Sequence, residues 1–272
     1  MASTHRRNAV EFLGAKLLGG LRWAGGLSLL GRETLRWAGR GVVHRRARLR
    51  RGTLSAQMVR VGVRSLGVVF VVQSFIGAIL ALQMAAPLAQ WGQESQIPRI
   101  VGAAGFRMLG PIITAVVLSG FAGASIAAEL GTMVVAEEVE ALEVMALNPV
   151  RFLVLPRVLA TFIMMILLTV IADLILAFGG YAAAWAALGP DVYRGYWDRM
   201  RDQLAYMDFF TGLIQGGVFG LLIGLIACFE GLGVRGGAQG VGRATTLTVV
   251  YSIVAIGAAA LVCTMIFYAF GL

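Results

Sequence analysis

The chain alternates between long apolar segments and short polar connections. Five of the apolar segments approach or exceed the roughly 18 to 20 residues that a membrane-spanning helix needs. Their approximate bounds are 66–88, 100–128, 157–188, 209–229 and 246–270. Pro149 and Pro156 end helical segments before the third span, and Pro156 can occupy its first turn. The pattern predicts an all-α integral membrane protein with five transmembrane helices.

Residues 1–64 precede the first span and are strongly basic. They carry 14 of the 23 Lys and Arg residues, and Leu, Phe and Trp alternate with Arg between residues 11 and 43. A helix with these two faces lies in the membrane interface, so one or more interfacial helices are predicted. Anionic headgroups would bind the cluster Arg45, Arg46, Arg48, Arg50 and Arg51. A nucleic-acid-binding arm is the alternative, but the interleaved Trp and Leu residues disfavour it, and no nucleic-acid partner is expected.

The basic N-terminal region fixes the orientation of the chain. Lys and Arg are enriched on the cytoplasmic side of membrane proteins, so the N-terminus is predicted to be cytoplasmic and the C-terminus external. Connections 129–156 and 230–243 then face the cytoplasm, and 85–99 and 189–208 lie outside. The last of these alternates Tyr and Trp with charged residues, which is typical of a short amphipathic helix or of an ordinary solvated loop.

Composition agrees with a membrane protein and gives little support to an enzyme. Hydrophobic residues make up 58% of the chain and charged residues 14%, against about 25% charged in soluble domains. Cys228 and Cys263 both lie in apolar segments, where packed thiols are a better explanation than a disulfide or a metal site. The two histidines lie in the basic N-terminal region, and no Ser/His/Asp arrangement is visible. We therefore predict no catalytic residue and no metal ligand.

The connection at residues 131–149 is acidic in a chain that holds only 14 acidic residues. Its carboxylates are Glu137, Glu138, Glu140 and Glu143. On one continuous helix, the residues that would share the opposite, apolar face are Val135, Val139, Leu142 and Ala146. A solvated acidic surface is one explanation. The apolar face and the tight end at Asn148-Pro149 instead favour a helix that docks into a groove of a partner.

A specific resemblance supports the docking interpretation. The passage AELGTMVVAEEVEALEVMALNPVRFLVLPRVLA, residues 128–160, closely resembles the core of the MlaE (YrbE) family, the permease subunits of MCE-type lipid ABC transporters. Three further blocks match in the same order, FIGAILALQ at 75–83, LGPIITAVVLSGFAGASIAAE at 109–129 and GGAQGVGRATTLTVV at 236–250. Several blocks in order are a much stronger signal than one short pattern.

The resemblance implies an assembly of several subunits. Two permease copies would pair in the bacterial inner membrane, each binding a cytoplasmic ABC ATPase, with an MCE-domain protein on the periplasmic face. Residues 65–272 would form the permease domain, and the acidic helix would be the coupling helix that contacts the ATPase. No G-x-x-x-x-G-K-[ST] motif occurs, and GGAQGVGRATT lacks the lysine that reaches phosphate. ATP would therefore bind the partner, and the chain itself needs no cofactor.

The resemblance also implies a path for membrane lipids along the spans. The candidate residues are Phe75, Ile79, Gln83, Arg107, Met108, Leu109, Phe121 and Gln215. Many family members carry charged residues at the positions of Met108, Phe121 and Gln215. An intramembrane ion without its partner is costly. The joint absence of all three charges from this chain therefore predicts that the three residues lie near one another in an apolar cavity wall. Independent drift at lipid-facing sites is the alternative.

Apart from Arg157 at the boundary of the third, two charged residues remain inside the predicted spans. Arg107 could attract a lipid phosphate or extend toward the interface, and Asp173 is expected to form a structural hydrogen bond. The function predicted from the whole sequence is a permease subunit that moves lipid, glycerophospholipid in particular, under ATP hydrolysis by a partner. A membrane-embedded enzyme of lipid metabolism and a stand-alone carrier are the alternatives, but no internal inverted repeat supports a carrier.

Overall fold

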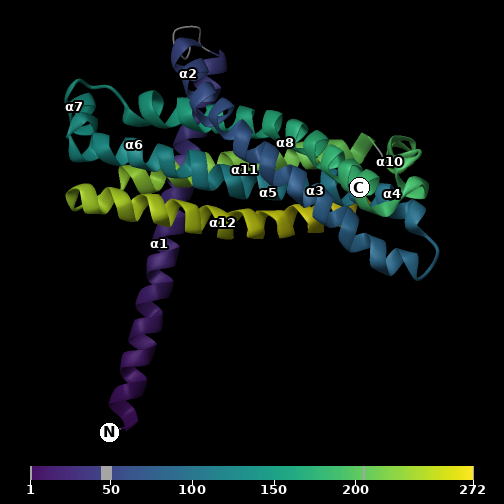
Figure 1. The fold of residues 1–272 in the computed structure, drawn as a ribbon. Coiled ribbons are helices and arrows are strands. Elements are labelled where there is room, and N and C mark those ends of the chain that lie inside the picture. The colour runs from purple at the N-terminus through teal and green to yellow at the C-terminus, as the bar shows by residue number, and fades with distance from the viewer. Residues whose placement is uncertain (1, 44–50, 205, 272) are drawn as a thin grey trace.

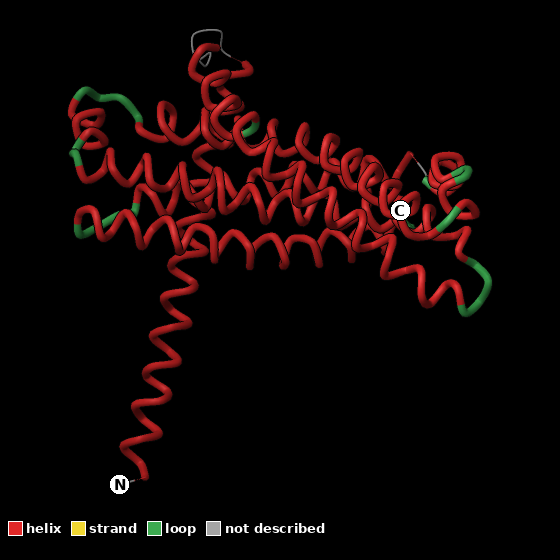
Figure 2. Tube along the Cα trace, in the orientation of Figure 1, coloured by secondary structure: helices red, strands yellow, loops and turns green. Residues whose placement is uncertain are grey.

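The computed structural model describes residues 2–43, 51–204 and 206–271, which are almost entirely helical and contain no strand (Figures 1 and 2). Five helical stretches are long and apolar enough to cross a membrane. They are Gly52–Ala89, Glu94–Val135, Val150–Leu188, Tyr206–Leu232 and Gly237–Phe270. Each contains one predicted span and extends beyond it, because flanking polar residues continue the helix. The all-α membrane class is confirmed.

Several of the spans are built from more than one helical segment. The first span comprises α2 (Arg51–Val61), η2 (Val63–Ser65) and α3 (Leu66–Ala89), so the predicted boundary at residues 64/65 falls inside a continuous helical stretch. The segments of the second span are η3 (Glu94–Gln96), α4 (Ile97–Ala104), η4 (Gly105–Leu109), α5 (Gly110–Leu118), η5 (Ser119–Gly123) and α6 (Ala124–Val135). The remaining spans are η6 (Val150–Val154) with α8 (Leu155–Ala183) and η7 (Ala184–Leu188), then α11 (Tyr206–Leu232) and α12 (Gly237–Phe270).

Helix α8 lies at the centre of the bundle and packs against α3, α5 and α11. Glycine allows the closest of these contacts. A Cβ atom on Gly77 of α3 would lie 1.9 Å from the carbonyl oxygen of Leu176, and one on Gly179 of α8 would lie 2.2 Å from that of Ser74. The two backbones therefore touch directly, which is typical of helix pairs in membranes.

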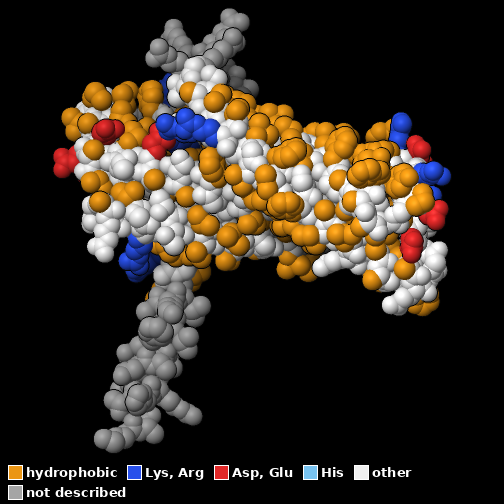
Figure 3. All heavy atoms as spheres, viewed as in Figure 1, with side chains coloured by type: hydrophobic (Ala, Val, Ile, Leu, Met, Phe, Trp, Pro, Cys, Tyr) orange, Lys and Arg blue, Asp and Glu red, His pale blue; other side chains and the backbone are white. Residues whose placement is uncertain are grey.

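Charged side chains gather at the two ends of the bundle, and the face between them is mainly apolar (Figure 3). One end carries α7 (Glu138–Val144) and the connection between α11 and α12. The other end carries the α3–α4 connection, α9 (Pro190–Tyr193), α10 (Tyr196–Gln203) and the C-terminus (Figure 1). The connections thus alternate between ends as the five predicted spans require.

Helix α1 (Ala2–Val43) runs crosswise to the spans near the α7 end (Figure 1). The Trp23 Nε1–H donates a hydrogen bond to Glu230 Oε1 at 2.6 Å, and the Trp23 ring packs against Phe229 and Tyr251. A helix in the membrane interface lies crosswise to the spans near one end of the bundle, and α1 has this orientation. Of the predicted headgroup-binding cluster, residues 45–50 lie outside the described residues.

Helix α10 settles the structure of the segment between the third and fourth spans. It is a short helix, as one of the two sequence interpretations held, and its Tyr196 side chain is buried against Tyr181 and Trp197. Burial raises the pKa of Tyr196 well above its ordinary value, because the phenolate would lose its hydration. The phenol therefore stays neutral and serves packing.

Candidate functional site

Helix α7 projects at one end of the bundle and is shorter than the sequence predicted. The helix was predicted around Glu137 to Ala146, and the structure forms it over Glu138–Val144 as α7. Glu137 and Ala146 flank it with φ angles of 59° and 57°, the only positive values among the described non-glycine residues. A left-handed residue interrupts helical hydrogen bonding and costs roughly 1–2 kcal/mol. Such strain is concentrated at functional sites, so α7 is a candidate site.

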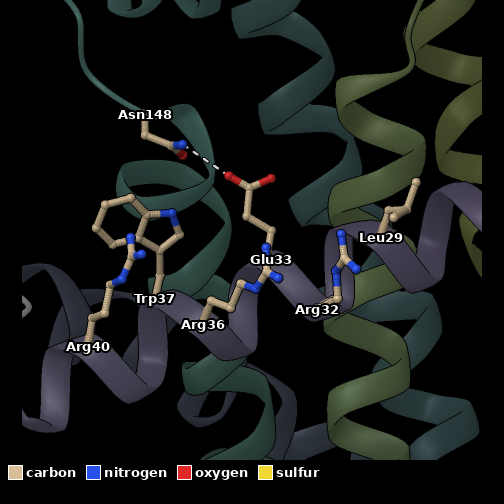
Figure 4. Close-up of a pocket in the computed structure, with 7 residues that line it drawn as sticks. All are labelled: Leu29, Arg32, Glu33, Arg36, Trp37, Arg40 and Asn148. Carbon is tan, nitrogen blue, oxygen red and sulfur yellow. Dashed lines mark hydrogen bonds between the residues drawn. The ribbon is translucent and has the colours of Figure 1, made fainter.

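Hydrogen bonds hold this strained segment in place. The Leu147 N–H donates to Leu142 O at 3.0 Å and closes the end of α7. Asn148 Oδ1 accepts from the Arg151 N–H at 3.2 Å, and Asn148 Nδ2 donates to Glu33 Oε1 of α1 at 3.0 Å (Figure 4). The connection is therefore attached both to the third span and to α1.

The exposed surface of α7 differs from the predicted one. Val139 and Leu142, which were expected to enter a partner's groove, are half-buried against the hydrophobic core of this chain. Val144 and Met145 are the apolar residues that project, with exposed fractions of 88% and 61%. The exposed residues of the predicted set are Val135, Glu137, Glu138, Glu140, Glu143 and Ala146. The site thus presents an acidic rim beside two apolar side chains.

An ion-pair network is centred on Glu129 of α6, the helix that precedes α7. Arg157 of α8 donates through Nη2 to Glu129 Oε1 at 2.9 Å and through Nη1 to Leu153 O at 2.7 Å. Arg60 of α2 pairs with the other oxygen of the same carboxylate. The network joins the first, second and third spans. It was missed as a site from sequence, although Glu129 and Arg157 lie near the two ends of the passage 128–160 that carries the family resemblance.

The residues predicted for a lipid path do not share one surface. Phe75, Ile79 and Gln83 are exposed and follow one another along a single face of α3. Arg107 and Leu109 lie in the π-helical turn η4, where Leu109 is half-buried and Arg107 Nη1 lies 3.5 Å from Asp208 Oδ1. Arg107 is therefore part of an ion pair at the α10 end.

The structure does not bring Met108, Phe121 and Gln215 together, so that prediction is wrong. Met108 and Phe121 are 13 positions apart in one helical stretch, which corresponds to about 20 Å along the axis. Both are exposed, at 49% and 40%, whereas Gln215 is 2% exposed inside the bundle. The exposure of Met108 and Phe121 fits the alternative of independent drift at lipid-facing sites, whereas the buried Gln215 does not fit it.

A polar cluster lies inside the bundle where α3, α5 and α8 meet. Gln73 Nε2 donates to Gly110 O at 3.1 Å and to Thr114 Oγ1 at 2.9 Å. Asp173 is 1% exposed, and a Cβ atom on Gly110 would lie 1.8 Å from its Oδ1. Within the described part of the chain this oxygen has no hydrogen-bond partner, so the bond expected for Asp173 is not formed there.

These features define a multi-pass α-helical membrane protein with a projecting acidic helix at one end. No cluster of three or more His, Cys, Asp or Glu side chains with metal-binding geometry occurs within the described ranges. The family model described as Permease MlaE matches residues 54–266, and the chain belongs to this family of membrane permeases.

Individual relatives agree with this assignment. The chain is 40% identical over 200 residues to a probable ABC transporter permease protein of Rickettsia felis, covering 74% of this chain and 77% of that protein. It is 32% identical to the intermembrane phospholipid transport system permease protein MlaE of Haemophilus influenzae, covering 75% and 78%. It is also 34% identical to the chloroplastic protein TRIGALACTOSYLDIACYLGLYCEROL 1 of Arabidopsis thaliana, covering 80% and 62%.

Proposed function

We propose that this chain is the permease subunit of an ABC transporter and that a separate cytoplasmic ATPase engages α7. The observation that carries the proposal is the exposed apolar pair Val144 and Met145 beside four exposed glutamates. An apolar contact edged by charge combines burial with electrostatic selection of a partner, here a basic one. The ATPase binds the ATP, and this chain supplies the lipid path.

The proposed cargo is a glycerophospholipid. One relative is named as a phospholipid transport permease, and the spans of this chain offer an apolar surface with few charges. Lipid moves between the inner membrane and an MCE-domain protein that binds the opposite, periplasmic end, where α10 and the C-terminus lie. The N-terminus is then cytoplasmic, as its basic residues favour.

The permease acts as a homodimer in this proposal. The spans that contain α3 and α12 have 28% and 17% of their most apolar segment buried within this chain, against 50% or more in the other three. Two spans thus retain large apolar faces that a second copy and bound lipid can cover. Phe75, Ile79 and Gln83 lie on the α3 face and would line the shared cavity.

The test uses the full complex purified from native membranes through a tag on this chain. Glu137→Lys/Glu140→Lys is expected to reduce the ATPase retained in the complex roughly tenfold or more, because each reversal places like charges together at the contact. Val144→Asp/Met145→Asp is expected to act in the same direction by placing charge in an apolar contact. Quantitative gel staining of the ATPase subunit is the measurement.

The matched control is Asp198→Lys/Asp202→Lys on α10, which reverses two exposed charges at the opposite end. This variant should keep the ATPase. If the α7 variants retain the ATPase and its lipid-stimulated ATP hydrolysis as the parent does, the proposed function of α7 is wrong.

A further inference from the structure

A basic cavity lies between α1 and the connection that follows α7 (Figure 4). Its volume is about 300 Å³. The polar and aromatic residues that line it are Arg32, Glu33, Arg36, Trp37, Arg40 and Asn148. Because α1 lies crosswise to the spans at the end of the bundle, the cavity sits where lipid headgroups would surround the protein.

The charges of the cavity favour an anion. Arg32, Arg36 and Arg40 are spaced four residues apart, so they lie along one face of α1. Three guanidinium groups and the Glu33 carboxylate leave a net charge of +2, and Glu33 Oε1 is engaged by Asn148 Nδ2. Within the described ranges, neither Arg32 nor Arg36 has an ion-pair partner. Positive charge is thus available to a ligand.

Trp37 organises one wall of the cavity. The guanidinium carbons of Arg40 and of Arg151, at the start of the third span, lie 5.2 Å and 5.4 Å from the centre of the Trp37 ring. Such cation–π contacts hold both guanidinium groups in place. An indole beside arginines is also typical of the headgroup region of membranes.

A second cavity adjoins the first and is lined by apolar residues together with Glu33, Glu230 and Arg235. It measures about 570 Å³ between α1 and α11 and shares Leu29 and Glu33 with the basic cavity. Trp23, Phe229 and Leu232 contribute its apolar walls. A free inorganic anion would use only the basic cavity, whereas an amphipathic molecule would use both.

We propose that the basic cavity binds the phosphate of an anionic membrane lipid, with the glycerol and upper acyl region in the adjoining cavity, along its apolar wall. Arginine suits this ligand because its planar donors match phosphate oxygens in pairs. The bound lipid would join α1 to Asn148 and so stiffen the connection that carries α7. The site lies on α1, apart from the residues proposed for transport, and does not depend on the proposed function.

The experiment is native mass spectrometry of the purified full chain in neutral detergent. Phosphatidylglycerol, or phosphatidylcholine as the zwitterionic comparison, is added to the parent and to Arg32→Gln/Arg36→Gln. The matched control is Arg64→Gln/Arg243→Gln, which removes two exposed arginines that line neither cavity. A further sample receives excess inorganic phosphate with the phosphatidylglycerol.

The parent and the control variant are expected to retain one phosphatidylglycerol per chain, with little phosphatidylcholine. Retention by Arg32→Gln/Arg36→Gln should be weaker by roughly tenfold or more, since two of the guanidinium groups that attract the lipid phosphate are removed. Inorganic phosphate should not displace the lipid.

Three results would each overturn the proposal. The first is equal retention by parent and Arg32→Gln/Arg36→Gln. The second is displacement by inorganic phosphate, which would make the ligand a free anion. The third is measured on the purified complex of the Arg32→Gln/Arg36→Gln variant. If that complex loses the ATPase while its lipid retention is unchanged, the cavity is a protein-docking surface.

Discussion

Glu129 forms ion pairs with two arginines that differ sharply in burial. The Arg157 side chain is 5% exposed and that of Arg60 is 45% exposed. A buried ion that loses its partner is strongly destabilising, whereas an exposed pair contributes little. The two pairs share one carboxylate but should differ in their effect on stability.

Glu129→Leu is expected to destabilise the protein by about 3 kcal/mol, because it leaves the Arg157 guanidinium buried without a counter-ion. Arg60→Gln should cost less than about 1 kcal/mol. Glu129→Leu/Arg157→Met should be milder than Glu129→Leu alone, since no unpaired charge remains. Thermal unfolding midpoints in detergent measure the order of stability of the three variants. Equal midpoints for all three would contradict the prediction.

At the scale of elements, the contact between α3 and α8 depends on glycine. A Cβ atom at Gly77 would enter the Leu176 carbonyl group, whereas nothing lies within 4 Å of one at Gly67 on the same helix. Backbone cannot move aside as a flexible side chain can. The position of each glycine, rather than the number of glycines in α3, therefore determines the packing.

Gly77→Ala should force α3 away from α8 and destabilise the bundle by roughly 1–3 kcal/mol, as overpacking does. Gly67→Ala, the matched control, should leave stability unchanged or slightly higher. Folded yield and thermal midpoint are the measurements. A Gly77→Ala protein that unfolds with the parent midpoint would show that the helices do not touch at this position.

The sequence predicted elements well where one physical requirement dominates. Apolar length identified all five spans, because a bilayer demands it. The ends of α7 were not predicted, because Glu137 and Ala146 adopt left-handed backbone without the glycine or asparagine that usually marks it. The apolar side of α7 was misjudged for a related reason, since periodicity shows that Val139 and Leu142 share a face but not what covers it.

At the scale of the whole molecule, successive spans run in opposite directions, so the connections lie at two ends of the bundle. Counting the spans in the sequence was enough to predict this arrangement. The neighbours of each side chain were not predictable in this way. Met108, Phe121 and Gln215 were grouped because each position lacks a charge, and the fold places them in separate surroundings. The network around Glu129 was not predicted, because its residues are far apart in sequence and meet only after the spans have packed.

The central claim is that the α7 end is cytoplasmic and contacts an ATPase. Its most direct test is thiol-to-amine cross-linking in native membranes of a Met145→Cys variant, with Asp198→Cys on α10 as the opposite-end control. Native Cys228 is buried, and Cys263→Ser removes the half-buried thiol from both variants. The account predicts a cross-link between Cys at position 145 and a cytoplasmic ATPase subunit, and none from position 198. Labelling of position 145 by a membrane-impermeant maleimide added to intact cells, with no ATPase cross-link, would contradict it.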